Sequence, residues 1–211
     1  MISVFDMFKV GVGPSSSHTV GPMKAGKQFI DDLIEQGKFD AVATLHVDVY
    51  GSLSMTGHGH NTDIAIIMGL AGYLPRDVDI VLIPTFIDQV KQTKKLSIAQ
   101  GKKTVNFDWD ANMVFHNSFL SLHENGMIIT ALDAERNVLY RQTYYSIGGG
   151  FIVDEAHSGQ EEENPVAVSY PYQYAEDILK HSQENGLMLS PVMMRNELAL
   201  RDKKEVEEHL H

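Results

Sequence analysis

The period of the hydrophobic pattern changes along the chain, and the order of these changes limits the folds open to it. Between Thr19 and Gln36 the apolar residues recur as in an amphipathic helix, and Gly37 follows as a C-terminal cap. Residues 42–50 alternate apolar and polar side chains, which is typical of a half-buried strand. Residues 62–71 are apolar nearly all round, which predicts a buried helix capped by Asn61 or Thr62.

The middle of the chain is dominated by strand-like segments. They are rich in β-branched and aromatic residues and cover 104–109, 126–133 and 137–147. The triple glycine at 148–150, before a last short strand, is interpreted as a strand connection or as a bulge that brings backbone close to a ligand. Helices that alternate with strands and then give way to a run of strands predict an α+β fold. We expect a mixed or antiparallel sheet with helices packed on one side.

Further helices are expected outside this sheet, over residues 2–9, from Pro84 to Lys94, and over 172–185 and 188–210. The segment GSLSMTGHGHN at 51–61 is expected to be a loop.

An acidic and polar stretch at residues 154–165 marks a domain boundary. The sequence therefore predicts an α+β domain over 1–155, a linker over 156–170 and a helical extension over 171–211. The last of these helices ends without a C-terminal cap.

Composition excludes several classes of function. The chain has 211 residues, of which 43% are hydrophobic, enough to bury a core. A net charge of -11 without a basic cluster argues against binding to nucleic acid or to anionic membrane surfaces. The sequence contains no apolar run long enough to span a membrane, and its N-terminus lacks the pattern of a signal peptide. The cytoplasm is therefore the expected location. The absence of cysteine excludes disulfides, a cysteine nucleophile and a thiolate-held metal cluster on this chain.

The segment GVGPSSSHTVGPM at residues 11–23 places small, hydroxyl and imidazole groups in the turn that opens a helix. Backbone N–H groups of a first helical turn have no partner within the helix and attract anions. Serine hydroxyls add donors, and an imidazole can change its charge near neutral pH. The side chains concerned are Ser15, Ser16, Ser17, His18 and Thr19. This pattern favours an anion site, and its alternative is a serine-rich cap with no ligand.

Histidines gather in loops at the ends of the predicted elements. They are His58, His60, His116 and His123. Such positions suit a small-molecule site in which an imidazole acts as general base. A zinc site is an alternative, but the H-x-H spacing lacks the helical H-E-x-x-H pattern, so no metal ligand is assigned.

Four segments, in this order, resemble the N-terminal half of the bacterial iron–sulfur L-serine dehydratases. They are GVGPSSSHTVGPMKAGKQF, DVYGSLSMTGHGHNTDIAIIMGL, FHNSFLSLHENGM and YYSIGGGFIVDE. The resemblance covers about residues 2–155, and MMRNELALRDKKEVEEHL is similar to the start of that family's helical catalytic domain. It implies a lyase that converts L-serine to pyruvate and ammonia by eliminating water. The family carries a [4Fe-4S] cluster on cysteines of the second domain, and this chain departs from the family there because it has none. The resemblance therefore implies either a truncated start of the catalytic domain or a separate subunit that lacks the cluster-binding half.

The resemblance also implies roles for individual residues. His60 would be the base that removes the Cα proton, because a neutral imidazole suits proton transfer near pH 7. Ser15, Ser16, Ser17 and His18 would hold the substrate carboxylate at the helix N-terminus. The polar groups that complete the site would be Thr62, His123, Asn125 and Ser146. No lysine stands out as a Schiff-base residue, so pyridoxal phosphate chemistry is not expected.

The expected partners are L-serine, a cysteine-bearing catalytic domain or subunit, and a second copy of the chain in a homodimer. A rival hypothesis makes the chain a non-catalytic module that binds an amino acid or an anion, because the family's domain resembles the regulatory anion-binding domain of some phosphoglycerate dehydrogenases. A third hypothesis, a metal hydrolase using His58, His60 and His123, has weaker support.

Overall fold

The computed structural model describes residues 3, 5, 10–155 and 167–210. The chain divides into two compact units, Val10–Ser158 and a second that joins Met1–Lys9 to Gly159–His211. The predicted domain limits at 155 and 171 stay a prediction, and the predicted helix over 2–9 lies, apart from residues 3 and 5, outside the described residues.

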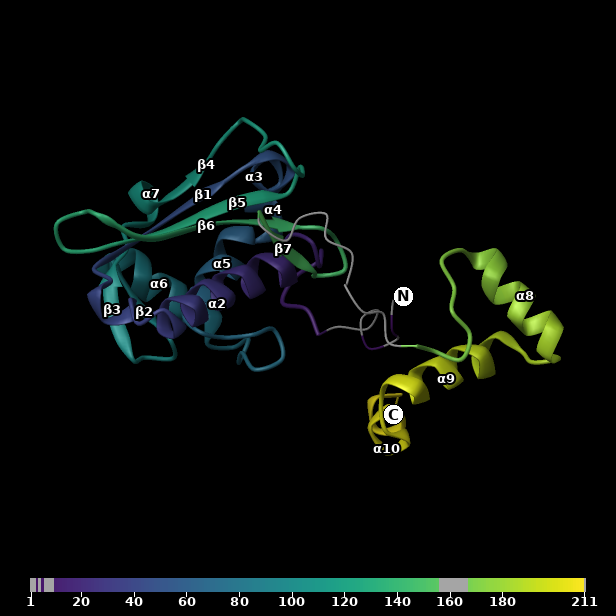
Figure 1. The fold of residues 1–211 in the computed structure, drawn as a ribbon. Coiled ribbons are helices and arrows are strands. Elements are labelled where there is room, and N and C mark those ends of the chain that lie inside the picture. The colour runs from purple at the N-terminus through teal and green to yellow at the C-terminus, as the bar shows by residue number, and fades with distance from the viewer. Residues whose placement is uncertain (1–2, 4, 6–9, 156–166, 211) are drawn as a thin grey trace. The chain divides into compact units, whose positions relative to one another are not determined.

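The unit Val10–Ser158 is built on a mixed sheet of seven strands (Figure 1). These are β1 (Thr44–Val49), β2 (Lys95–Ile98), β3 (Lys103–Asn106), β4 (Met113–Phe115), β5 (Gly126–Leu132), β6 (Val138–Ser146) and β7 (Ile152–Asp154). Their order is β2-β3-β1-β5-β6-β7, and β4 also pairs with β1. Strand β1 runs parallel to β3 and β4 and antiparallel to β5, which confirms the predicted α+β fold with a mixed sheet.

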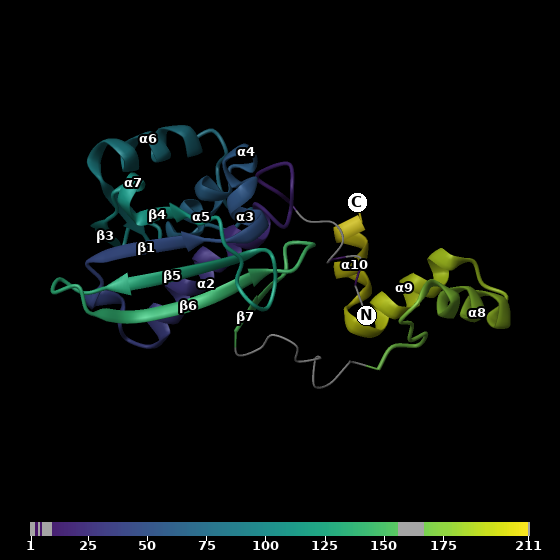
Figure 2. The same ribbon diagram turned by 90° about the horizontal axis from the view of Figure 1, so that it is seen from above.

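Helices α2 and α5 cover one face of the sheet (Figure 2). The helices of this unit are α2 (Val20–Glu35), α3 (Gly51–Met55), α4 (Gly57–His60), α5 (Thr62–Leu70), α6 (Ile83–Thr93) and α7 (Trp109–Asn112), with a 3-10 turn at Phe39–Ala41. The core lies between this layer and the sheet, where Leu45, Val47 and Val49 of β1 are fully buried. Helices α2 and α5 meet at Gly26 and Gly69, so their backbones approach without an intervening side chain.

Two parts of the sequence-based assignment are wrong in this unit. The segment 51–61 was expected to be a loop, but it forms helices α3 and α4. Asn61, the residue that follows α4, has a left-handed backbone conformation with φ 60°. Local backbone bonds such as His60 N–H to Thr56 O hold these turns, and the glycines that flank them hid the helical pattern. Asn61 precedes α5 as predicted, but among the described residues its side chain makes no capping bond. The predicted strand 104–109 ends at Asn106.

The C-terminal helices form the second unit. They are α8 (Ala175–Asn185), α9 (Leu189–Leu200) and α10 (Lys203–Leu210). The single helix expected over 188–210 is wrong, because Arg201 is extended and α10 begins after Asp202, a residue type that favours helix starts. The described part of the N-terminus belongs here: Ser3 donates a hydrogen bond of 2.7 Å to buried Glu197, and the ring of Phe5 stacks on His209. Across the described residues, none of the helices has the length and apolar character needed to cross a bilayer.

Candidate active site

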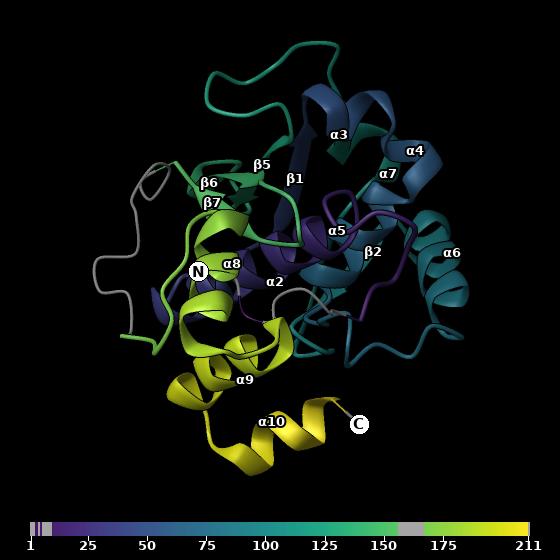
Figure 3. The same cartoon turned by 90° about the vertical axis from the view of Figure 1, so that its right-hand side faces the viewer.

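One end of the sheet collects the predicted site residues. Strand β1 ends there and leads into α3 and α4, while the loop over 116–125 returns to the start of β5 beside α3 (Figure 3). The serine turn before α2 reaches the same place, because the His18 ring contacts both Ser52 and His60. Segments far apart in the sequence thus supply one group of polar side chains.

The serine turn is folded around His18. The His18 Nε2 atom lies 3.3 Å from the carbonyl oxygen of Ser52, and Nδ1 lies 3.0 Å from the Ser17 hydroxyl and 3.3 Å from the Ser15 hydroxyl. A carbonyl only accepts hydrogen bonds, so Nε2 carries the proton and Nδ1 accepts from a serine hydroxyl. Burial lowers the pKa of His18, and the nearby His60 lowers it further, although the bond to Ser52 acts in the opposite direction. The geometry therefore favours a neutral His18.

The structure does not support the alternative that the serines merely cap the helix. Thr19 is the N-cap residue of α2, and among the described residues its side chain makes no capping bond to the helix. The Thr19 hydroxyl donates instead to the Ser15 carbonyl oxygen at 2.6 Å. Ser16 is exposed, and Pro22 lies in the first helical turn as predicted. The hydroxyl of Ser16 therefore remains available to a ligand.

His60 ends helix α4 with its basic nitrogen unoccupied. Its Nδ1 lies 2.9 Å from the carbonyl oxygen of Thr56, so Nδ1 carries the proton of the neutral ring. Nothing among residues 10–155 bonds Nε2, which keeps a lone pair directed away from that carbonyl. The ring centroids of His60 and His18 are 4.8 Å apart, so the His60 ring lies beside the serine turn. A histidine held in this tautomer is suited to accept a proton.

His123 has the opposite tautomer. The backbone N–H of Asn125 donates to its Nδ1 at 3.0 Å, so the neutral ring carries its proton on Nε2. His123 can therefore donate a hydrogen bond, whereas its basic nitrogen is occupied. The Asn125 side chain then donates to the carbonyl oxygen of Ser146 at 3.2 Å, which links this loop to the end of β6.

Three buried polar atoms of this region have no hydrogen-bond partner within the part of the chain that the structure describes. They are Thr62 Oγ1, Asn125 Oδ1 and Ser146 Oγ. Buried polar groups are nearly always bonded, because leaving one unpaired costs about 1–3 kcal/mol. All three belong to residues that the family resemblance assigns to the substrate site. The free-energy cost of leaving these groups unpaired is therefore concentrated where a ligand could offset it.

Two glycines allow the segments to meet. A Cβ atom on Gly21 of α2 would lie 2.1 Å from the Ser146 hydroxyl, and one on Gly51 would lie 2.1 Å from the carbonyl oxygen of Glu124. Gly51 also has a φ of 58°, a conformation that favours glycine. Ser52, whose carbonyl orients His18, is a site residue that the sequence did not predict. Its only signal was its place within the segment DVYGSLSMTGHGHN.

The other two loop histidines have separate partners. His58 is exposed and lies 3.6 Å from the Asp63 carboxylate, with its ring against Phe115, and His116 bonds to Asp48. In residues 3, 5, 10–155 and 167–210, no three histidine, aspartate or glutamate side chains are grouped so that they could hold a metal ion.

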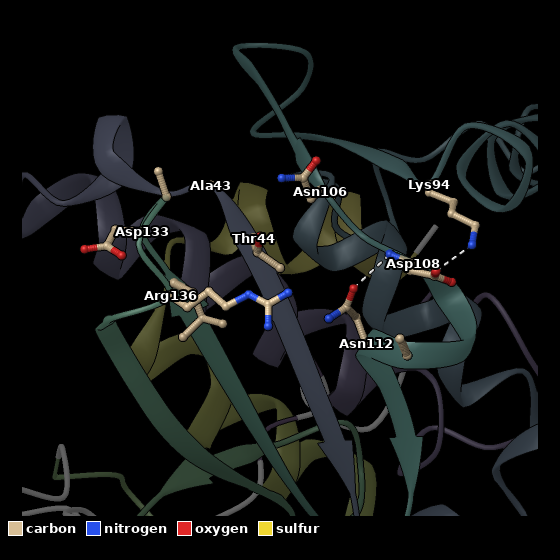
Figure 4. Close-up of a pocket in the computed structure, with 11 residues that line it drawn as sticks. Ala43, Thr44, Lys94, Asn106, Asp108, Asn112, Asp133 and Arg136 are labelled. Atoms are coloured by element: carbon tan, nitrogen blue, oxygen red, sulfur yellow. Dashed lines mark hydrogen bonds and ion pairs between the residues drawn. The ribbon is translucent and has the colours of Figure 1, made fainter.

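A cavity of about 720 Å³ lies at the opposite end of β1 and contains none of the predicted site residues. Figure 4 shows Arg136 extending toward β1 beside Thr44, and Lys94 bonded to Asp108 at the far side. The cavity is therefore a second feature, distinct from the histidine and serine cluster.

A pH effect is expected from the lowered pKa of His18. The unfolded chain binds a proton on His18 more readily than the folded chain does. The contribution of His18 to the free energy of unfolding is therefore fully present above a pH of about 6.5 and is lost as the pH falls below that value. Thermal unfolding between pH 7.5 and 5.5 should show the melting temperature decreasing with pH. The His18→Asn variant should lose less stability over that range, and an equal loss in both proteins would contradict the assignment.

Comparison with known proteins shows the family to which the chain belongs. Residues 3–157 match the family model of the serine dehydratase beta chain, and the chain belongs to that family. The L-serine dehydratase of Haemophilus influenzae is 70% identical over 210 residues, and L-serine dehydratases 2 and 1 of Escherichia coli are 63% and 60% identical. These matches include 99 to 100% of this chain and 46% of each relative. The chain thus spans about half the length of the curated relatives it matches.

Proposed function

We propose that this chain supplies the substrate-binding and proton-removing part of an L-serine dehydratase. The observation that carries the proposal is that, among the described residues, Nε2 of His60 has no hydrogen-bond partner. The His60 ring lies beside that of His18, and three buried polar atoms of the same region also lack a partner within the described part of the chain. The name that the relatives carry, L-serine dehydratase, supports serine as the substrate.

The bound serine would be held through its charged groups. Its carboxylate would accept hydrogen bonds from Ser16 and Ser17 at the positive end of α2, a helix without an acidic residue in its first turn. The single O–H of Ser17 would then point to the carboxylate, and Ser15 would supply the hydrogen bond to His18 Nδ1. Its ammonium would donate to Asn125 Oδ1, which can only accept. The hydroxyls of Thr62 and Ser146 can serve as donor or acceptor, and His123 Nε2–H as a donor.

Proton removal falls to His60 in this arrangement. Nε2 would take the proton from the serine Cα while Nδ1–H stays bonded to Thr56, which fixes the ring and stabilises the imidazolium that forms. Loss of the Cα proton and of the β-hydroxyl as water leaves aminoacrylate, which hydrolyses to pyruvate and ammonia.

The [4Fe-4S] cluster that the family resemblance implies does not fit the residues of this chain, which has no cysteine. Its ligands would therefore lie on a cysteine-bearing domain or subunit outside these residues. Exposed apolar side chains on α3, in the loop over 116–125 and just before α6 support contact with such a partner. They include Met55, Ile80, Val81, Leu82, Phe119 and Leu122. The homodimer and the cytoplasmic location stay predictions.

The second candidate function is a regulatory module that binds an amino acid or an anion. It is favoured by the cavity beside Arg136, whose guanidinium would attract a carboxylate, whereas Lys94 is already paired with Asp108 (Figure 4). Such a module needs no free basic nitrogen on His60.

Anaerobic assembly of this chain with the remaining part of the Haemophilus influenzae relative, which we expect to bear the cysteines, tests the proposal. We expect L-serine to yield pyruvate and ammonia in equal amounts. If the assembled and iron-loaded protein binds L-serine but forms no pyruvate, the regulatory function is the correct one.

The Ser16→Ala variant separates a carboxylate site from a helix cap. In the assembled enzyme it should weaken serine binding by about 1–3 kcal/mol, the usual loss for a hydrogen bond to a charged group, and so raise KM. The thermal stability of the chain should hardly change, because the exposed Ser16 side chain makes no cap. A loss of about 1 kcal/mol in stability with an unchanged KM would refute the assignment.

A further inference from the structure

The polar side of β1 carries a carboxylate between two imidazoles. Nε2 of His116 lies 2.7 Å from Asp48 Oδ1, and Nε2 of His46 lies 3.3 Å from the same oxygen. The Asp48 side chain is only 17% exposed. Burial raises the pKa of Asp48, yet the hydrogen bonds from the two histidines outweigh burial and hold the pKa below its ordinary value. The carboxylate is therefore ionised and bonded at neutral pH.

The two histidines differ in what they are attached to. His46 belongs to β1 itself, whereas His116 is the first residue after β4 and begins the loop over 116–125. The ring of His116 also stacks on Tyr50, with centroids 4.4 Å apart and planes 7° apart, and its backbone N–H donates to the Val49 carbonyl oxygen. The start of the loop over 116–125 is thus fixed by contacts of His116 with Asp48, Val49 and Tyr50.

The same loop is tied to the start of α3. The backbone N–H of Gly51 donates to the carbonyl oxygen of Ser118 at 2.9 Å, and that of Ser52 donates to Glu124 at 2.8 Å. Figure 3 shows the loop beside α3. Ser52 in turn orients His18, and the loop carries His123 and Asn125. A displacement at His116 would therefore reach the polar groups of the candidate active site.

We propose that Asp48 is a positioning residue that acts through His116. It fixes the loop over 116–125, and through that loop it holds His123 and Asn125 in place. The importance of those two residues for serine rests on the proposed function, but the mechanical link from Asp48 to the loop does not.

Hydrogen exchange of this chain tests the link directly. The amides of Gly51 and Ser52 donate into the loop, so they should exchange about tenfold faster, or more, in Asp48→Ala and in His116→Leu. His46→Leu is the matched control, because it removes a histidine from the same oxygen without touching the loop. Amides of the central strand β5 report global unfolding and should change less than those of Gly51 and Ser52.

The double variant Asp48→Ala/His116→Leu should exchange no faster at these amides than either single variant, since one interaction is removed in each case. Unchanged exchange at Gly51 and Ser52 in His116→Leu would overturn the proposal. An equal acceleration in His46→Leu would also overturn it, because the effect would then arise in the strand.

Kinetics of the assembled enzyme separate this inference from the proposed function. Asp48→Ala and His116→Leu should raise KM for L-serine by at least about threefold, whereas His46→Leu should not. Accelerated exchange with an unchanged KM would support the positioning of the loop and refute the serine contacts of His123 and Asn125. A raised KM without accelerated exchange would overturn the positioning role.

Discussion

Replacing His60 with alanine should lower kcat of the assembled enzyme by about a hundredfold or more, the usual scale for a lost general base. The binding of serine should change much less, because the proposed carboxylate and ammonium contacts come from other residues. Steady-state kinetics at saturating L-serine, with anaerobic protein of equal iron content, measures both quantities.

The His58→Ala variant is the matched control. His58 lies two residues away on α4, and its exposed ring is paired with Asp63 on α5, so kcat should stay close to that of the unaltered enzyme. A near-normal kcat in His60→Ala would move the base to another residue. His123 would then be the first to replace, although its basic nitrogen is bonded to the Asn125 amide.

The second large effect is expected from the chain by itself. Stripped of metal ions and without a cysteine-bearing partner, it should fold and yet form pyruvate from L-serine no faster than buffer does. The physical reason is that a histidine base alone cannot expel hydroxide at a useful rate, since nothing stabilises the leaving group.

Circular dichroism should show the mixed helix and strand content of the folded chain, which guards against a trivial absence of activity. Turnover well above the buffer background in this metal-free protein would show that the elimination needs no group from outside the chain. The [4Fe-4S] part of the proposal would then be wrong.

The sequence predicted the elements whose periodicity persists over many residues. Helices α2, α5 and α6 and strands β1, β5 and β6 lie close to their predicted limits, because each buries one continuous face or is buried all round. Strands β2 and β4, with four and three residues, are too short to show a period. Strand β4 forms beside the longer β1, and β2 forms by pairing with β3, which has four residues as well.

The candidate site was predictable as a set of residues but not as a geometry. The tautomers of His18, His60 and His123 depend on carbonyl and amide groups of Ser52, Thr56 and Asn125, which only the folded chain brings within reach. The link from Asp48 to His116 joins positions 68 residues apart, so no local pattern could reveal it.

The pairing of Ser3 with Glu197 bears on the order of events during synthesis. The first described residues of the chain find their partners only after α9 and α10 have left the ribosome, whereas Val10–Ser158 has by then been translated in full. Translation proceeds at about 5–20 residues per second, which leaves several seconds for the sheet to form first. Ser3 therefore reaches its partner Glu197 only after the unit Val10–Ser158 has had time to fold.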